Sequence, residues 1–176
     1  MKSAADPGAE SPRRLFAAVA LTAIVLDQIT KFMAEATLLR SAAVSVFGDW
    51  AQLRLVYNQG AAFGLHVGPY SRWVFFTIAI IAIVVLYRMS RETPPSDTFR
   101  QVALGLIAGG AAGNLIDRIR SSRGVVDFID VGIGAMRWPT FNVADIAVTC
   151  GAIALAVSLW REDNRRPIEA DSAPAS

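Results

Sequence analysis

Phe141-Asn-Val-Ala-Asp-Ile-Ala-Val-Thr-Cys-Gly-Ala-Ile-Ala-Leu-Ala-Val-Ser-Leu-Trp160 is the stretch of sequence that decides the fold. It is long enough to cross a bilayer, because about 20 residues of helix span roughly 30 Å of hydrocarbon. Its first turns contain an aspartate, Asp145, with no Lys, Arg or His within four residues on either side. A carboxylate at membrane depth is costly and marks a functional site by default. We therefore expect its charge to be compensated by another segment or by a proton.

The composition is typical of an integral membrane protein. Of the 176 residues, 53% are hydrophobic and 18% are charged, whereas about 25% charged residues are usual in soluble domains. The net charge is +2 and the basic residues form no stripe, so a nucleic-acid partner has little support. The single cysteine, Cys150, excludes an internal disulfide and a Cys-rich zinc site. Its apolar neighbours predict a buried, inert thiol.

Three further segments are long and apolar enough to cross a membrane. The sequence therefore predicts a mainly α, polytopic membrane protein with four transmembrane helices. The spans cover approximately residues 15–38, 72–87, 99–119 and 141–160. The first span also has features of a cleavable signal peptide, because two arginines precede it and Ala34-Glu-Ala36 follows its apolar part. Asp27 and Lys31 interrupt that pattern, and we expect this segment to be retained as a helix.

The positions of Lys and Arg predict the orientation, since cytoplasmic loops carry an excess of them. Basic residues cluster before the first span, in the second connection and after the last span. They are Lys2, Arg13, Arg14, Arg88, Arg91, Arg100, Arg161, Arg165 and Arg166. The opposite side also carries arginines, but in longer connections, which the rule discounts. Both termini are therefore expected in the cytoplasm.

The chain is expected to form one membrane domain, residues 15–162, between two disordered tails, 1–14 and 163–176, that are polar and contain proline. Apolar and polar residues alternate between the first two spans, at about residues 43–68. This alternation predicts a small extracytoplasmic β-element. Within it, Asn58 to Gly64 is too rich in glycine for a strand interior. This stretch suits close backbone approach or a flexible lid.

Five aspartates lie in the spans or near them on the extracytoplasmic side: Asp27, Asp117, Asp127, Asp130 and Asp145. Lys31 follows Asp27 by four residues, the favourable order for a helical ion pair, so a structural role is favoured for Asp27. Arg120 follows Asp117 by three residues, and local neutralisation is plausible there too.

The residues before Asp117 leave two interpretations open. Asn114 and Arg118 lie on one face of the third span. The glycines at 109–113 allow another helix or a substrate to approach closely. This face is therefore either a helix-packing seam or part of a site.

Asp127 and Asp145 have no such local partner. Asp127 lies in the connection between the third and fourth spans, and Asp145 begins the fourth, with Asn142 on the same helical face. Two carboxylates can therefore meet at the extracytoplasmic edge of the membrane. Repulsion between them raises one pKa, so the pair can supply a general base and a general acid together. The alternative is a buried, hydrogen-bonded pair without turnover.

Other hydrolytic schemes have weaker support. The single histidine, His66, has no Ser or Cys nucleophile motif nearby, and the His-Glu-x-x-His pattern of zinc proteases does not occur. A chemistry based on two carboxylates requires no metal and no organic cofactor.

Five blocks of sequence carry a family resemblance. They are Asp27-Gln-Ile-Thr-Lys31, Asn58-Gln-Gly-Ala-Ala-Phe-Gly64, Gly109-Gly-Ala-Ala-Gly-Asn-Leu-Ile-Asp-Arg118, Val125-Val-Asp-Phe128 and Phe141-Asn-Val-Ala-Asp145. In this order they resemble the successive motifs of the bacterial lipoprotein signal peptidases, also called signal peptidase II. Ala112 stands where leucine is common, and Ile146 where a small polar residue often follows the second aspartate. Both departures are expected to affect packing only.

The resemblance implies a four-helix aspartyl endopeptidase of the bacterial inner membrane. Such enzymes remove the signal peptide of prolipoproteins by hydrolysing the bond before a diacylglyceryl-modified cysteine, at the extracytoplasmic face. Asp127 and Asp145 would be the catalytic pair. The residues that would shape the site or bind the substrate are Asp27, Asn58, Gly60, Asn114, Asp117, Arg118 and Asn142. The implied partners are prolipoproteins and membrane lipid, and a monomer is expected.

Two functions of other classes compete with this one. A proton- or ion-coupled transporter subunit also has intramembrane carboxylates and Gly-rich helices. A membrane assembly factor would use the seam at residues 109–113 for partner helices. The transporter predicts ion flux, and the assembly factor predicts that enlarging the seam is more harmful than Asp145→Asn.

Overall fold

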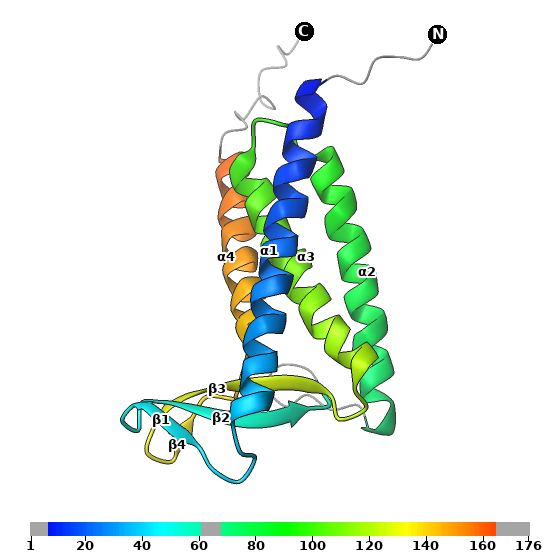
Figure 1. Cartoon of the computed structure of the whole chain (residues 1–176). Helices are drawn as coiled ribbons and strands as arrows, with labels where there is room; N and C mark the ends of the chain where they lie inside the picture. Colours follow the sequence, from blue (N-terminus) through cyan, green and yellow to red (C-terminus); the bar gives the residue numbers. More distant parts are fainter. Residues whose placement is uncertain (1–6, 61–67, 165–176) are drawn as a thin grey trace, which may run out of the picture.

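The computed structural model describes residues 7–60 and 68–164 of the chain. Four long helices stand side by side and a small β-sheet lies at one end of them (Figure 1). All four helices are long and apolar enough to cross a membrane. The predicted fold class, a four-helix membrane protein with a small β-element, is confirmed.

The helices are α1 (Pro7–Thr37), α2 (Ser71–Glu92), α3 (Thr98–Arg120) and α4 (Val143–Asp163). The predicted spans agree with them, except that α1 begins earlier than expected. Residues 7–14, which the sequence analysis assigned to a disordered N-terminal tail, form the beginning of α1 in the structure. Pro7 suits a first helical turn, where its fixed φ is helical and its missing N–H has no partner to lose. The first turn of α1 and the last turn of α4 lie at the end opposite the sheet (Figure 1).

Helix α3 is packed against the other three helices, and its glycines let α1 and α4 come close. A Cβ atom on Gly109 would lie 2.6 Å from the carbonyl oxygen of Ala20 in α1, and one on Gly113 would lie 2.5 Å from the Asp27 carboxylate. Gly110 faces Ala144 of α4 in the same way. Small residues in a membrane allow such close backbone contacts. The seam predicted at residues 109–113 is therefore a real packing surface.

Large apolar side chains cover the outward faces of the helices. The exposed ones include Leu21, Leu26 and Phe32 on α1, Ile78 and Ile81 on α2, and Ile153 and Leu159 on α4. An apolar surface of this extent suits hydrocarbon rather than water.

The sheet has four antiparallel strands in the order β1 (Val44–Phe47), β2 (Ala51–Asn58), β3 (Val125–Ile133) and β4 (Met136–Arg137). The β-element predicted between the first two helices therefore includes two strands from the connection between α3 and α4. A short 3-10 helix, η2 (Gly68–Tyr70), precedes α2. The connection that contains Asp127 was expected to be a loop, and it is strand β3. Its first four residues, 125–128, are all buried, so the alternation that marks a strand is missing from the sequence.

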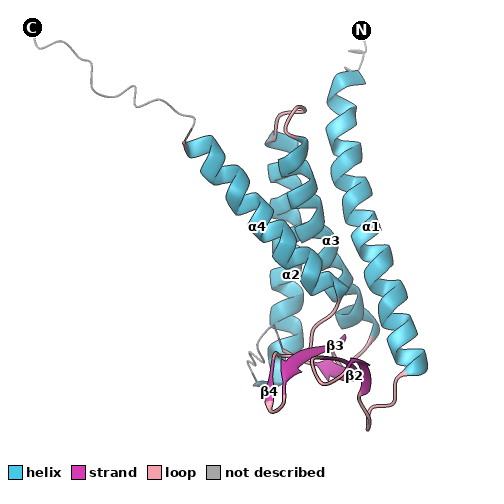
Figure 2. Cartoon of the chain, turned by 90° about the vertical axis from the view of Figure 1, so that its left-hand side faces the viewer, coloured by secondary structure: helices cyan, strands magenta, loops and turns pink. Residues whose placement is uncertain are grey.

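An apolar cluster attaches the sheet to the end of α1. It consists of Ala34, Leu38, Leu55, Val126 and Phe128. The strands lie across the ends of the helices in both views (Figures 1 and 2). In β3, Asp127 pairs with Val56, next to a bulge in β2 between Leu53 and Val56. Val126 and Phe128 point into the cluster, so the intervening Asp127 faces the other side of the strand.

Candidate active site

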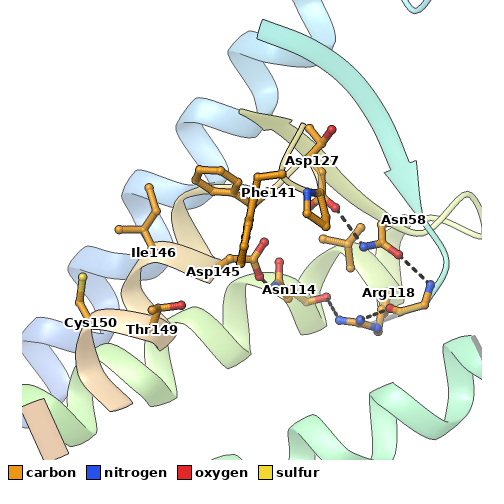
Figure 3. Close-up of a pocket in the computed structure, with 14 residues that line it drawn as sticks. Asn58, Asn114, Arg118, Asp127, Phe141, Asp145, Ile146, Thr149 and Cys150 are labelled. Carbon is orange, nitrogen blue, oxygen red and sulfur yellow. Dashed lines mark hydrogen bonds between the residues drawn. The ribbon is translucent and has the colours of Figure 1, made fainter. Parts of the chain in front are cut away.

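Two carboxylates from distant parts of the chain face one cavity. Asp127 lies on β3 and Asp145 in the first turn of α4. The strand and the helix are held side by side by Phe141, whose carbonyl oxygen accepts hydrogen bonds from the N–H groups of Phe128 at 3.0 Å and Ile129 at 2.8 Å. Figure 3 shows both aspartate side chains at the cavity. The predicted meeting of Asp127 and Asp145 is thus found in the structure.

Each carboxylate oxygen of this pair accepts one hydrogen bond from an amide. Asp127 accepts from the side chains of Asn142 at 2.7 Å and Asn58 at 3.1 Å. Asp145 accepts from the Asn114 side chain at 2.8 Å and from the backbone N–H of Asn142 at 3.2 Å. The four donors are neutral, so they fix the positions of the carboxylates without neutralising them.

The electrostatics favour a proton on Asp127. Its side chain is almost completely buried, with 2% exposed. Burial, followed by the nearby negative charge of Asp145, raises the pKa of Asp127 from 3.8 to about 7. The hydrogen bonds from Asn58 and Asn142 act in the opposite direction but are weaker influences. Near neutral pH the pair can therefore hold one proton, as an acid and a base working together would need.

Asn142 connects the two carboxylates because it begins α4. Its side-chain oxygen accepts from the backbone N–H of Asp145 at 2.9 Å, and the Asp145 side chain accepts from the Asn142 backbone. This reciprocal arrangement is a capping box, which satisfies N–H groups at a helix start. The remaining side-chain nitrogen of Asn142 is free to bind Asp127. The predicted association of Asn142 with Asp145 is confirmed.

Asn58, Gly60 and Arg118 line the cavity, and Figure 3 shows the hydrogen bond from Asn58 to Asp127. The Asn58 side chain accepts a hydrogen bond from the Gly60 N–H at 2.9 Å, which aims its amide nitrogen at Asp127. Arg118 donates to the carbonyl oxygens of Gly60 at 2.9 Å and Asn114 at 3.1 Å. One guanidinium therefore links the end of β2 to α3 beside the two carboxylates.

A buried charge cluster lies where α1 meets α3. Lys31 forms ion pairs with Asp27 at 2.8 Å and with Asp117 at 2.9 Å. The predicted Asp27–Lys31 pair is confirmed. The predicted local partner of Asp117 is wrong, because Arg120 instead pairs with Glu35 of α1 at 2.8 Å. Asp117 faces inward and Arg120 faces outward, so the two point away from each other around the helix.

The cavity has a volume of about 400 Å³ and is lined by both polar and apolar residues. The polar lining is formed by Asn58, Gly60, Asn114, Arg118, Asp127 and Asp145. The other lining residues are mostly apolar: Val125, Trp138, Pro139, Thr140, Phe141, Ile146, Thr149 and Cys150. Of the predicted site residues, Asp27, Asp117 and Asn142 do not line the cavity and act from behind it.

Some residues that line the cavity were not predicted as site residues from the sequence. Ile146 and Cys150 line it from one face of α4. Ile146 was expected to affect packing only, and Cys150 was expected to be buried, but the structure leaves Cys150 exposed at the cavity. Ile146 and Cys150 are four residues apart, and this spacing is the signal that would have placed them on one face of the helix.

Two predictions fall on residues outside the described part of the chain. The first is the part of the predicted lid that follows Gly60, and the second is the interpretation of His66 as a residue outside any nucleophile motif. Within residues 7–60 and 68–164, no group of three or more His, Cys, Asp or Glu side chains is arranged to hold a metal ion.

The family model described as signal peptidase (SPase) II matches residues 19–161. The chain belongs to the signal peptidase II family. The lipoprotein signal peptidase of Hydrogenovibrio crunogenus is 40% identical over 142 residues, which cover 80% of this chain and 81% of the relative. The lipoprotein signal peptidase of Nitratidesulfovibrio vulgaris is 40% identical over 155 residues, which cover 85% of this chain and 91% of the relative.

Solved structures agree with this membership of the signal peptidase II family. One, described as a bacterial membrane enzyme at 2.3 Å resolution, has a TM-score of 0.75 and 32% identity, and the match covers 87% of this chain and 92% of the other. A second bacterial membrane enzyme, at 1.9 Å resolution, has a TM-score of 0.72 and 33% identity. The resemblance inferred from the five sequence blocks is therefore confirmed, and the chain is a multi-pass membrane peptidase by family.

Proposed function

We propose that this chain is an aspartic endopeptidase that removes the signal peptide of prolipoproteins by hydrolysing the bond before a diacylglyceryl-modified cysteine. The observation that carries the proposal is the pair Asp127 and Asp145. They face one cavity, every carboxylate oxygen accepts an amide hydrogen bond, and the pKa of Asp127 is raised to about 7. The family membership and the names of the relatives support the substrate class.

The reaction begins with a water molecule between the two carboxyl groups. Ionised Asp145 removes a proton from the water as its oxygen attacks the scissile carbonyl carbon. Protonated Asp127 gives its proton to the carbonyl oxygen, which produces a neutral gem-diol. Asp145 then gives its proton to the amide nitrogen while Asp127 takes a proton from one hydroxyl of the gem-diol, and the C–N bond breaks to leave a carboxylic acid and the amino group of the modified cysteine. The aspartates end the cycle sharing one proton again, and no metal or organic cofactor takes part.

The polar and the apolar lining residues of the cavity suit different parts of the substrate. The polar lining residues can form hydrogen bonds with the peptide backbone, and the apolar lining residues suit the lipid-modified side of the substrate. Because the lipid is anchored in the bilayer, it restricts where the scissile bond can lie relative to the aspartates. We propose an active site at the extracytoplasmic face, both termini in the cytoplasm, and a monomer as the active unit.

The test compares a diacylated precursor with the same precursor lacking the lipid. Purified wild-type protein should cleave the first before the cysteine and leave the second intact. Asp127→Asn and Asp145→Asn should each lower the rate by a factor on the order of 1,000 or more while the protein stays folded in detergent, because each removes one of two proton-transfer roles. Appreciable cleavage by the double variant would refute the two-aspartate mechanism.

A further inference from the structure

Lys31 of α1 is a buried cation that the proposed reaction does not use. Its side chain is 1% exposed. The ammonium group has three hydrogens, and three oxygens accept from it: Asp27 at 2.8 Å, Asp117 at 2.9 Å and the side-chain oxygen of Asn114 at 2.8 Å. Donors and acceptors match in number, so each ammonium hydrogen has its own partner.

The third of these bonds decides which way the amide of Asn114 faces. Its oxygen, Oδ1, accepts from Lys31, and its nitrogen, Nδ2, donates to Asp145 at 2.8 Å. In the reversed orientation the NH₂ group would face the ammonium and the oxygen would face the carboxylate. Both contacts would be repulsive. Asn114 can therefore donate to Asp145 only while a donor occupies its other side.

Asn142 is the other possible donor to that oxygen, and it is a poor substitute for Lys31. Its Nδ2 lies 3.1 Å from Asn114, but also 2.7 Å from Asp127 and 3.2 Å from the carbonyl oxygen of Val126. An amide nitrogen has two hydrogens, so three acceptors compete for them. The short bond to the Asp127 carboxylate takes one, which leaves Lys31 as the dedicated donor to Asn114.

The ion-pair partners of Lys31 hold the backbone of the site as well. Asp27 accepts from the N–H of Ala144, the residue before Asp145, at 2.9 Å. Asp117 accepts from the N–H of Val126, the residue before Asp127, at 3.1 Å. The buried cluster therefore contacts both chain segments that supply the carboxylates.

We propose that Lys31 is a positioning residue for hydrolysis, which acts through Asn114 to keep Asp145 in the orientation that the attacking water requires. The inference rests on the proposed function, since it gives Lys31 a part in that same reaction. It goes beyond an ion pair that merely joins α1 to α3. A structural ion pair would affect folding alone, whereas a positioning residue affects turnover in protein that is folded.

The experiment uses the full-length protein in detergent and separates kcat from KM on the diacylated precursor. Lys31→Met removes the three donors but leaves two unpaired buried carboxylates, which can destabilise the protein. The double variants Lys31→Met/Asp117→Asn and Lys31→Met/Asp27→Asn keep the formal charge of the cluster at −1, as in the wild type. In the folded double variants we expect kcat to fall on the order of 100-fold, as misplacement of a reacting group does, with KM little changed.

Gln101→Met is the matched control. Gln101 is also fully buried, and its side-chain oxygen accepts a 2.7 Å hydrogen bond from the hydroxyl of Ser90 in α2. It lies near the start of α3, at the end of the helix far from Asn114. Its replacement should lower the thermal midpoint and leave kcat at the wild-type value. Asp117→Asn and Asp27→Asn alone measure the effect of the second substitution in each double variant.

The outcomes separate this inference from the proposed function. If wild-type protein cleaves the lipidated precursor but a folded double variant keeps its kcat within about twofold of the corresponding single Asp→Asn variant, Lys31 has no positioning role. The same conclusion follows if all Lys31 variants unfold, because the lysine is then needed for folding and not for the orientation of the Asn114 side chain. A wild-type protein that does not cleave overturns the proposed function and this inference together.

Discussion

The side-chain amide of Asn142 donates a 2.7 Å hydrogen bond to the carboxylate of Asp127. Asn142 is also the N-cap residue of α4 and binds the backbone of Asp145. One side chain thus starts a helix and joins the two carboxylates of the site. A loss of this residue should therefore have two separable effects, one on stability and one on turnover.

Asn142→Ala tests both effects, with Asp97→Ala as its control. Asp97 is the N-cap of α3 and accepts from the Arg100 N–H at 2.9 Å, and it does not line the cavity. Each substitution should lower the free energy of unfolding by about 1 kcal/mol through loss of a cap. Only Asn142→Ala should also reduce kcat, by a factor on the order of 100. Equal activity in the two variants would show that Asn142 acts only as a cap.

The activity should decrease as the pH rises through about 7. Burial and the charge of Asp145 raise the pKa of Asp127 to about 7, and the proposed mechanism needs a proton on that group. The measurement is kcat/KM for precursor cleavage between pH 5 and 9, because this ratio reports the pKa values of the free enzyme. A ratio that stays constant from pH 6 to 9 would contradict Asp127 as the proton donor.

The stability should depend on pH through the same group. Because the pKa of Asp127 is raised from 3.8 to about 7 on folding, the folded protein keeps a proton that the unfolded chain releases between these values. Its stabilising contribution is complete below pH 3.8 and is lost as the pH rises to about 7. Asp127→Asn removes the titrating group. The stability difference between the wild type and this variant should therefore fall with pH across that interval and level off above it, as measured by thermal unfolding in detergent.

Gly113→Ala should disturb the site through the helix seam. A Cβ atom at position 113 would lie 2.5 Å from the Asp27 carboxylate, which binds the first turn of α4. Gly105→Ala is the control, because its Cβ would meet the backbone oxygen of Phe16 at 2.9 Å, away from the cavity. Both variants should have lower thermal midpoints. Below both midpoints, only Gly113→Ala should lose activity; if Gly105→Ala loses as much, the effect belongs to packing in general.

Arg118→Lys should weaken catalysis although the positive charge is kept. Arg118 donates through two nitrogens to the carbonyl oxygens of Gly60 and Asn114, and a single ammonium cannot reproduce this planar geometry. Loss of one such bond should lower kcat/KM about 10- to 100-fold. Arg54→Lys on the exposed side of β2 is the control and should leave kcat/KM unchanged. Full activity of Arg118→Lys would mean that charge alone is needed at this position.

Much of the architecture could be predicted from the sequence, because it depends on local pattern. Continuous apolar segments predict the four helices, and the alternation after residue 50 predicts β2. The convergence of Asp127 and Asp145 was predictable because neither residue has a partner nearby in the sequence. The helices and β2 follow from the spacing of residues along one segment, whereas the catalytic pairing of Asp127 and Asp145 was implied by the family resemblance.

The features that the sequence did not reveal depend on contacts between segments. Strand β3 is buried from residue 125 to 128, so it lacks the alternation of a strand with one exposed face. Asp117 binds Lys31 of another helix, although Arg120 is closer in sequence. The partner of a buried charge depends on which helix faces approach each other, and spacing along one helix does not specify that.

The hydrogen bond from the Ala144 N–H to Asp27 joins residues that are 117 positions apart. During synthesis, α1, α2 and α3 leave the ribosome before α4 has been translated. Asn142 and Asp145 belong to that last part, so the paired carboxylates come together only once α4 has been made. In the proposed mechanism, a copy that stops before α4 would keep Asp127 but have no second carboxylate to work with it.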